Sequence, residues 1–315
     1  MRRELENTTT SAVAKLLDEI RDEGGAVALG RVLTLLVHTQ MGEEEDAIVA
    51  ANEASREHPM RVVVVSRNRD EVRAKEEGRL DAEIRVGGDA GASEVVVLRC
   101  YGEMGSQLEG IVQGLLLPDA PIVAWWPTFM PSDPGHAQLG QIAHRRITDA
   151  AAQEHACDAL LSLAESYRPG DTDLSWTRLT NWRAHLAAML DQPPFEPVTS
   201  ALVQGDADSP SVQLLAAWLR TRLQIEVTLE DPADLPIGSS GLSRIVLYRT
   251  HGENSITRIE ESTGLLQQTG QPDHRVALSR RGLRDQLNEE LRRLDSDDMY
   301  GEVLREYSLS RQEES

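Results

Sequence analysis

The chain has 315 residues, of which 40% are hydrophobic and 27% are charged, and its formal net charge is −20 at pH 7. This length allows two domains of ordinary size, and the hydrophobic content excludes a largely disordered chain. The acidity opposes contact with a phosphate backbone, so we expect no nucleic-acid partner.

The sequence indicates a cytoplasmic protein with reduced thiols. Residues 1–11 carry charges and hydroxyl groups without the apolar centre of a signal peptide. No run approaches the roughly 18 apolar residues of a membrane span, so we expect no membrane partner. Cys100 and Cys157 are far apart in sequence and lack the spacing of a metal site. We expect both to be buried, with no bound metal.

Helical and strand patterns alternate along the first half of the chain. Hydroxyl residues at 8–11 precede the stripe Val13, Leu16, Leu17 and Ile20, which predicts an amphipathic helix. Strands are expected at 27–37, 61–66, 80–86, 94–99, 120–126 and 146–148. Helices are expected at 43–57, 103–117, 139–145 and 150–167. Four consecutive valines after a helix, at 62–65, are typical of βαβ winding with helices on both sheet faces.

The strand at 80–86 has a different pattern from its neighbours. Apolar residues alternate there with Asp81, Glu83 and Arg85. This period of two predicts a half-exposed strand with one face toward solvent.

A domain boundary is expected where three prolines fall within residues 193–197, because proline cannot continue a helix. We therefore predict an N-terminal α/β domain at 1–192, a C-terminal domain at 198–309 and a loose tail at 310–315. In the C-terminal domain, helices are expected at 210–223 and 282–294. Strands are expected at 225–229, 243–249, 255–260 and 276–278. The expected fold class is α/β, with a mixed, largely parallel sheet flanked by helices and a second, smaller α/β (α+β) domain.

The segment 171–183 favours recognition over catalysis. It holds two of the five tryptophans among acidic residues and arginines, and tryptophan and arginine are the side chains that often carry binding energy at interfaces. It contains no histidine, cysteine or nucleophile with a base at a familiar spacing, and we assign no catalytic residues. Trp182 falls on the apolar stripe of the helix expected from Thr177. Arg178 and Arg183 lie off that stripe, so they are available to a partner or to the acids of the segment.

Trp125 and Trp126 end an expected strand, so their side chains point to opposite faces. One is expected in the core. For the other, core packing is the favoured interpretation. The alternative is that it lines a pocket or remains exposed as an anchor, because ligands collect at the carboxyl ends of strands in open α/β sheets. The residues expected to contact a partner are Trp125, Trp126, Trp176, Arg178 and Arg183.

A second candidate site is electropositive. His144, Arg145 and Arg146 can hold a phosphate or a carboxylate, although a salt-bridged helix terminus explains the cluster equally well. The glycine-rich segment 87–91 is followed by a strand pattern rather than the helix of a phosphate loop, which favours a hairpin turn. Arg85 and Asp89 beside it can still contact a ligand.

Six blocks of the sequence together resemble the glucose-6-phosphate dehydrogenase assembly protein family, OpcA, in its actinobacterial form. The blocks are residues 8–13, 54–62, 85–94, 119–127, 145–149 and 171–183. The resemblance covers nearly all of the chain up to Leu190 and continues more loosely beyond it.

The resemblance implies a protein that is not an enzyme and has no cofactor. It would bind glucose-6-phosphate dehydrogenase, assist its assembly or activate it, and so support NADPH supply by the oxidative pentose phosphate pathway. The thiol redox control of photosynthetic relatives is not transferred, because this chain has no paired cysteine motif. The alternative function is a sugar-phosphate sensor or enzyme that uses the arginine and histidine cluster.

Overall fold

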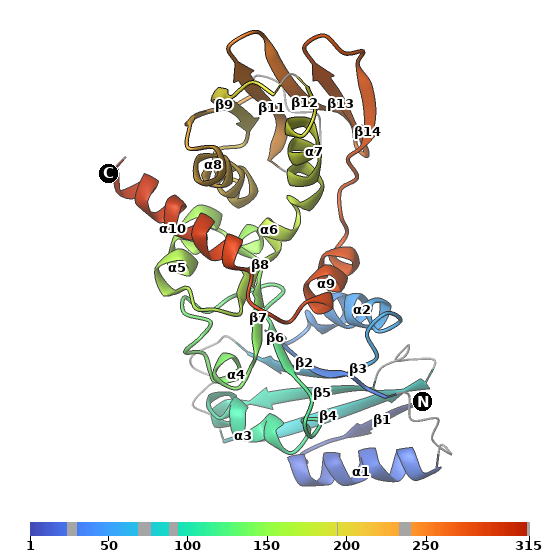
Figure 1. Cartoon of the computed structure of the whole chain (residues 1–315). Coiled ribbons are helices and arrows are strands. Elements are labelled where there is room, and N and C mark those ends of the chain that lie inside the picture. Colours follow the sequence, from blue (N-terminus) through green and yellow to red (C-terminus); the bar gives the residue numbers. More distant parts are fainter. Residues whose placement is uncertain (24–29, 69–76, 88–93, 194, 233–240, 314–315) are drawn as a thin grey trace. The chain divides into compact units, whose positions relative to one another are not determined.

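The computed structural model describes residues 1–23, 30–68, 77–87, 94–193, 195–232 and 241–313. The chain divides into two compact units. The first unit comprises Met1–Ala152, Gly170–Thr172 and Leu283–Ser296, and the second comprises Gln153–Pro169, Asp173–Gly282 and Asp297–Ser315. The expected fold class is confirmed, since the described residues form a large, mostly parallel sheet with helices and a second sheet (Figure 1).

The first unit is built on an eight-stranded sheet in the order β1-β4-β5-β3-β2-β6-β7-β8, as far as the described residues show. The strands are β1 (Arg2–Leu5), β2 (Leu33–Gln40), β3 (Met60–Arg67), β4 (Arg79–Val86), β5 (Glu94–Tyr101), β6 (Ile122–Trp125), β7 (Arg145–Thr148) and β8 (Asp171–Asp173). Parallel pairing joins β5, β3, β2, β6 and β7, whereas β4 and β1 add to one side in antiparallel pairs. The winding direction therefore reverses between β2 and β6, as in doubly wound folds.

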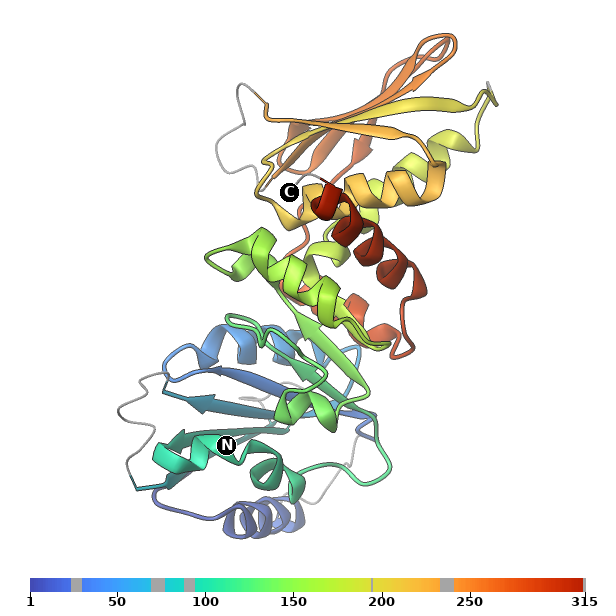
Figure 2. The ribbon, with the colours of Figure 1, turned by 90° about the vertical axis from the view of Figure 1, so that its left-hand side faces the viewer.

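Helices cover both faces of this sheet (Figures 1 and 2). They are α1 (Thr10–Glu23), α2 (Glu44–Ala54), α3 (Leu108–Gln113), α4 (Gln138–Gln141) and α9 (Leu283–Arg292). On one face, the stripe Val13, Leu17 and Ile20 of α1 packs in a core with α3, α4 and the apolar side of β4. The other face carries α2, which packs against α9. The valine run of β3 is fully buried because both of its faces are covered.

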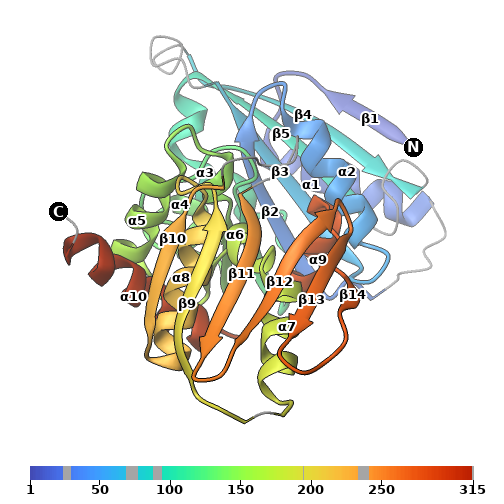
Figure 3. The same ribbon diagram turned by 90° about the horizontal axis from the view of Figure 1, so that it is seen from above.

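The second unit has a six-stranded sheet in the order β10-β9-β11-β12-β13-β14, within the described residues. The strands are β9 (Val198–Gly205), β10 (Glu226–Glu230), β11 (Leu242–Arg249), β12 (Glu253–Glu260), β13 (Thr263–Gln268) and β14 (His274–Ala277). The helices are α5 (Ala156–Ser166), α6 (Leu174–Thr177), α7 (Thr180–Leu190), α8 (Pro210–Leu223) and α10 (Asp298–Glu313). Figure 3 shows the strands of this sheet in front of α7 and α8.

Several elements differ from the sequence-based expectation. The helix expected at 103–117 is a 3-10 helix at Gly102–Ser106 followed by the short α3, and Arg145 begins β7 instead of ending a helix. The face of β4 expected toward solvent is largely covered, with Glu83 fully buried, because the side chains of Arg2, Arg85 and Arg99 gather around Glu83 and Arg85 reaches Glu45 at the start of α2. The helix α10 was not expected, and it includes residues 310–313 of the tail predicted to be loose. Its buried side, Tyr300, Val303, Leu304 and Tyr307, packs within the second unit.

The proline-rich segment 193–197 connects α7 to β9 inside the second unit. The chain passes from one compact unit to the other near residues 152, 170–172, 283 and 296, and no such crossing falls at the prolines. Independent folding of 1–192 and 198–309 remains a prediction.

Candidate functional site

Trp176 is the centre of a buried cluster in the second unit. Its helix α6 begins with a cap in which Asp173 accepts from the backbone N–H of Ser175 at 2.8 Å. The Trp176 side chain is only 2% exposed, and its Nε1 donates to Oδ2 of Asp297 at 2.8 Å. The ring centroid of Tyr300 lies 5.9 Å away. Trp176 therefore orders the interior of this unit and offers little surface to a partner.

Trp125 and Trp126 are also core residues, at 0% and 1% exposure. Their side chains leave the strand on opposite faces, and both faces of the sheet are covered. Nε1 of Trp126 donates to Nδ1 of His38 at 3.2 Å, which satisfies its polar atom. Of the alternatives left open by the sequence, core packing of both tryptophans agrees with the structure, because neither ring reaches the surface. The alternative of a pocket-lining or exposed anchor is not supported.

Arg178 and Arg183 are the members of the expected partner-binding set that keep accessible surface, both at half-buried positions. The guanidinium carbon of Arg183 lies 3.6 Å from the ring centroid of Trp176, and Nη1 of Arg178 is 3.4 Å from Oγ of Ser175. A cation over an indole face is stabilised by the ring quadrupole. Arg183 therefore links the surface of α7 to the buried cluster.

In the electropositive cluster of His144, Arg145 and Arg146, the two arginines pair with different carboxylates. Arg145 is 4% exposed, and its guanidinium contacts the carboxylate of Glu290 and the carbonyl of Asp295 at 2.7 Å. Arg146, 8% exposed, pairs with Asp171 and donates to the carbonyl of Ala143 at 3.0 Å.

His144 is exposed and accepts from the N–H of Ile122 at 3.1 Å. Between the two alternatives left open by the sequence, the geometry favours ion pairing. The arginines lie in β7, however, and not at a helix terminus.

Arg85 is likewise bound to carboxylates. It contacts both oxygens of Glu45 on α2 and also Glu83, which in turn contacts Arg2 at 2.8 Å and Arg99 at 3.2 Å. Burial acts to raise the pKa of Glu83, but hydrogen bonds from the arginines outweigh it and hold the pKa below its usual range. Asp89, expected beside Arg85, lies outside the described residues, as does most of the predicted 87–91 turn.

The winding reversal between β2 and β6 is where a doubly wound protein holds a phosphate, at the N-terminus of the helix after its first strand. Here a carboxylate of the chain itself takes that position. Oε2 of Glu44 accepts from the N–H of Gly42 at 2.8 Å, and Oε1 accepts from Oγ of Ser66 at 2.7 Å.

Glu44 is only 6% exposed, and two further acids, Glu45 and Asp46, stand in the same helical turn. This arrangement disfavours a bound nucleotide phosphate. Sequence reasoning missed Glu44, although an acidic helix start directly after an apolar strand was a signal for it.

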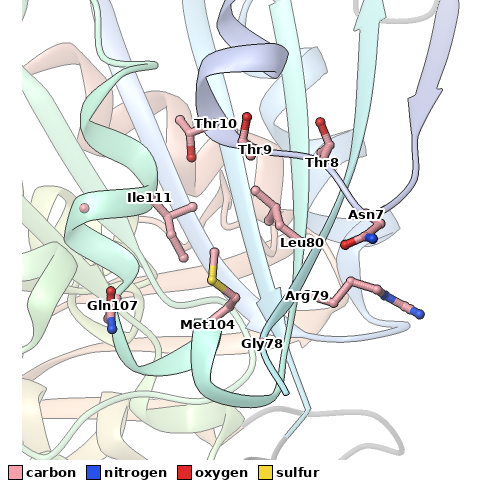
Figure 4. A pocket seen from close by; sticks show the side chains of 11 residues that line it. Asn7, Thr8, Thr9, Thr10, Gly78, Arg79, Leu80, Met104, Gln107 and Ile111 are labelled. Atoms are coloured by element: carbon pink, nitrogen blue, oxygen red, sulfur yellow. The ribbon is translucent and has the colours of Figure 1, made fainter. Parts of the chain in front are cut away.

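A pocket of about 450 Å³ lies in the first unit (Figure 4). Its lining combines the hydroxyl residues Thr8–Thr10 at the start of α1 with the apolar side chains of Leu80, Met104 and Ile111. Arg79 at its edge pairs with Asp81 at 3.0 Å. The lining residues include no acid, histidine or cysteine, so the pocket has no pair of side chains for acid–base catalysis.

Two further findings concern metals and membranes. Among the described residues, no three His, Cys, Asp or Glu side chains are grouped so as to hold a metal ion. Within the part of the chain that the structure describes, every helix is too short or too polar to cross a lipid bilayer.

Comparison with known families gives two adjoining matches. Residues 51–165 match the model for the N-terminal domain of a glucose-6-phosphate dehydrogenase subunit, described as an assembly domain, and residues 169–304 match the model for the C-terminal domain of the same family. The fold is that of an α/β protein, and both matching family models are described as domains of a glucose-6-phosphate dehydrogenase subunit. The chain belongs to the glucose-6-phosphate dehydrogenase assembly protein family, OpcA, which confirms the resemblance found in its sequence.

No curated protein matches the chain in sequence. Among solved structures, an oxidoreductase from Sinorhizobium meliloti is similar at 10% identity and a TM-score of 0.43, covering 88% of this chain and 86% of that one. A structure described as "Trehalose-6-phosphate from E. coli bound with UDP-2-fluoro glucose" is similar at 10% identity and a TM-score of 0.26, covering 63% and 64%.

Proposed function

We propose that this chain is a non-catalytic assembly factor that binds glucose-6-phosphate dehydrogenase and favours its active oligomeric state. The observation that carries the proposal is the pair of adjoining family matches, both described as parts of a subunit of that dehydrogenase. In this role the chain acts in the cytoplasm and supports NADPH supply by the oxidative pentose phosphate pathway.

The geometry supports a role in binding rather than in catalysis. The phosphate position of the doubly wound sheet is filled by Glu44, and the buried arginines of the candidate anion site contact carboxylates. The pocket beside α1 lacks acid–base groups. A protein that binds without reacting can still activate an enzyme, provided that it binds the active state more tightly.

The required preference is small. A difference of about 1.4 kcal/mol in binding free energy between two states of the dehydrogenase shifts their ratio tenfold. The test is a titration of purified chain into purified dehydrogenase, following oligomer mass by sedimentation and reaction rate in parallel. We expect the larger oligomer and the rate to rise together and to saturate. Unchanged mass and rate at saturating chain would refute the proposal.

We include Arg178 and Arg183 in the proposed contact surface, because they alone of the expected set keep accessible surface. Arg178→Ala combined with Arg183→Ala is expected to weaken binding to the dehydrogenase while the chain stays folded. Binding equal to that of the unmodified chain would remove both residues from the contact surface.

A sugar-phosphate sensor built on Arg85, Asp89 and residues 144–146 is less well supported, because a ligand phosphate would have to displace buried carboxylates. Thermal unfolding with glucose 6-phosphate tests it. A ligand at 100 times its dissociation constant adds about 2.7 kcal/mol to the free energy of unfolding. We expect no such shift.

A further inference from the structure

The two faces of the second sheet differ in what covers them. Residues of one face, such as Ala201, Val203 and Ile245, are buried on the side of α8. On the same side, Nε2 of Gln268 donates to the carbonyl of Met189 in α7 at 3.3 Å. Among the described elements of this unit, no helix lies over the opposite face (Figure 3). We refer to that opposite face as the open face.

Strand register identifies the side chains of the open face. Leu202 of β9 stands opposite Thr228 of β10 and Val246 of β11. Val246 in turn stands opposite Ser255 of β12, and Ser255 opposite Gln267 of β13. Val246 and Ser255, in the middle of this row, are buried, whereas Leu202 and Gln267 are half-buried and Thr228 is exposed.

This row crosses five strands without a charged residue. Val246 and Ser255 are only 1% and 2% exposed, so the accessible part of the row is Leu202, Thr228 and Gln267. In a chain of net charge −20, these uncharged side chains are a place where another protein can approach without repulsion.

Two exposed aromatic side chains lie near one end of the second sheet. Tyr248 lies opposite Ser200 in the register and is 36% exposed, and Phe195, which precedes β9, is 76% exposed. Glu196 accepts from the N–H of His251 at 3.2 Å and contacts its ring Nδ1 at 3.0 Å. This link ties the segment beside Phe195 to the turn after β11, and so to the end of the sheet where Tyr248 lies.

The exposure of Phe195 is unusual for this chain. The sequence contains only two phenylalanines, and the other, Phe129, is buried at 6% exposure. Leaving an aromatic ring in water forfeits the free energy of its burial. Rings that reach into a partner's pocket regain it, and aromatic residues are enriched at the cores of interfaces.

The charges around the open face indicate the kind of partner. Arg244 pairs with Glu253 at 3.6 Å and Arg275 with Glu260 at 3.7 Å, so these charges balance. The outer strand β10 adds Glu226 and Glu230, which are exposed. A second copy of the chain would bring the same acidic border and be repelled by it.

We propose that the open face, with Phe195 and Tyr248 as anchors, is a second surface that binds the dehydrogenase, separate from the surface that carries Arg178 and Arg183. The complementary surface on that enzyme is apolar where it receives the two rings and basic where it meets β10. This inference rests on the proposed function, and it adds the place of contact.

The test compares exposed apolar residues at two sites. The double variant Phe195→Ser and Tyr248→Ser is expected to raise the Kd for purified dehydrogenase at least about tenfold. The control is Leu309→Ser on α10, which removes an exposed apolar side chain of 58% exposure away from the open face and is expected to leave the Kd unchanged. The single variant Phe195→Ser, outside any helix or strand, separates a binding effect from a folding effect and is expected to weaken binding alone.

The acidic border formed by Glu226 and Glu230 of β10 is tested by reversing its charge. Glu226→Lys with Glu230→Lys is expected to weaken binding, because it places positive charge opposite the basic part of the partner. Tighter binding by this variant would overturn the proposed charge arrangement.

The outcomes separate the two proposals. If the unmodified chain does not bind the dehydrogenase, the proposed function and the docking surface both fail. If the unmodified chain, the Leu309 variant and the Phe195–Tyr248 variant all bind within about twofold of one another, only the docking surface fails.

Discussion

The guanidinium of Arg183 lies over the indole of Trp176, 3.6 Å from the ring centroid, and the same indole donates to Asp297 at 2.8 Å. Trp176 belongs to α6, Arg183 to α7, and Asp297 precedes α10. One buried ring therefore joins segments of the second unit that are more than a hundred residues apart in sequence. The cluster is a structural centre whose loss affects the whole unit.

Trp176→Ala is expected to lower the free energy of unfolding by about 3–5 kcal/mol, the usual result of removing a large aromatic side chain from a core. Arg183→Ala is expected to lower it by only about 0.5–1 kcal/mol, because the cation is partly solvated. Urea unfolding followed by Trp fluorescence and circular dichroism measures both. Equal midpoints for Trp176→Ala and the unmodified chain would contradict the structural role.

The sequence was sufficient to predict the parallel winding, because four consecutive valines are typical of a strand covered on both sides. It was insufficient for β4. Its alternation separates Glu83 and Arg85 from the apolar side, but a period of two does not reveal that arginines from other strands and Glu45 of α2 pair with them and bury Glu83. The sequence also drew attention to the tryptophans, because they are large and rare in this chain. Whether each ring points into the core or toward solvent depends on tertiary packing, which no local sequence pattern records.

The buried pair of Arg145 and Glu290 offers a test of the anion-site alternative. Arg145→Ala is expected to lower the free energy of unfolding by about 3–5 kcal/mol, because the buried carboxylate of Glu290 then loses the arginine that pairs with it. Replacing both residues with methionine is expected to cost much less than this single change. Urea unfolding of the unmodified chain, Arg145→Met, Glu290→Met and the double methionine variant gives the coupling free energy. Additive effects would mean that the two side chains do not depend on each other.

Glu44 lies where a doubly wound protein holds a phosphate, so its removal should open that position to an anion. Glu44→Ala leaves the hydroxyl of Ser66, which is fully buried, without its acceptor, and this costs about 1–3 kcal/mol. The N–H of Gly42 also loses its acceptor, but Gly42 is exposed and water can replace it. Inorganic phosphate is expected to raise the melting temperature of this variant more than that of the unmodified chain, since the anion can take the vacated place. Asp46→Ala, in the same turn, is the control. An equal response of all three proteins to phosphate would show that Glu44 does not fill an anion position.

The two thiols are expected to react slowly and unequally. Burial raises the pKa of Cys100 to about 12, and burial also raises the pKa of Cys157, although that residue is only half-buried. Because the thiolate is the reactive form, both are protected at neutral pH, and Cys100 more so. Labelling with a thiol reagent followed by peptide mass analysis should find Cys157 modified first and Cys100 only upon unfolding. Rapid labelling of Cys100 in the folded chain would contradict its burial.

The carboxylate of Glu83 is expected to link stability to pH. Its pKa in the folded chain is lowered, whereas in the unfolded chain it lies near the usual value of about 4.3. Its ionised form therefore stabilises the fold above about pH 4.3, and this contribution is lost as the pH falls through the folded pKa. Glu83→Gln should thus reduce stability at neutral pH and flatten its dependence on acid.

The comparison with Glu45 makes this prediction specific. The pKa of Glu45 is also lowered, chiefly by its hydrogen bond from Arg85, but its side chain is 65% exposed, so solvent screens the interaction. Glu45→Gln is expected to change stability by at most about 1 kcal/mol, whereas Glu83→Gln removes a fully buried charge from its arginine partners and should cost about 3–5 kcal/mol at neutral pH. Urea midpoints measured from neutral to acid pH should show the curve of Glu83→Gln approaching that of the unmodified chain as the pH falls. Parallel curves would mean that Glu83 does not titrate on unfolding.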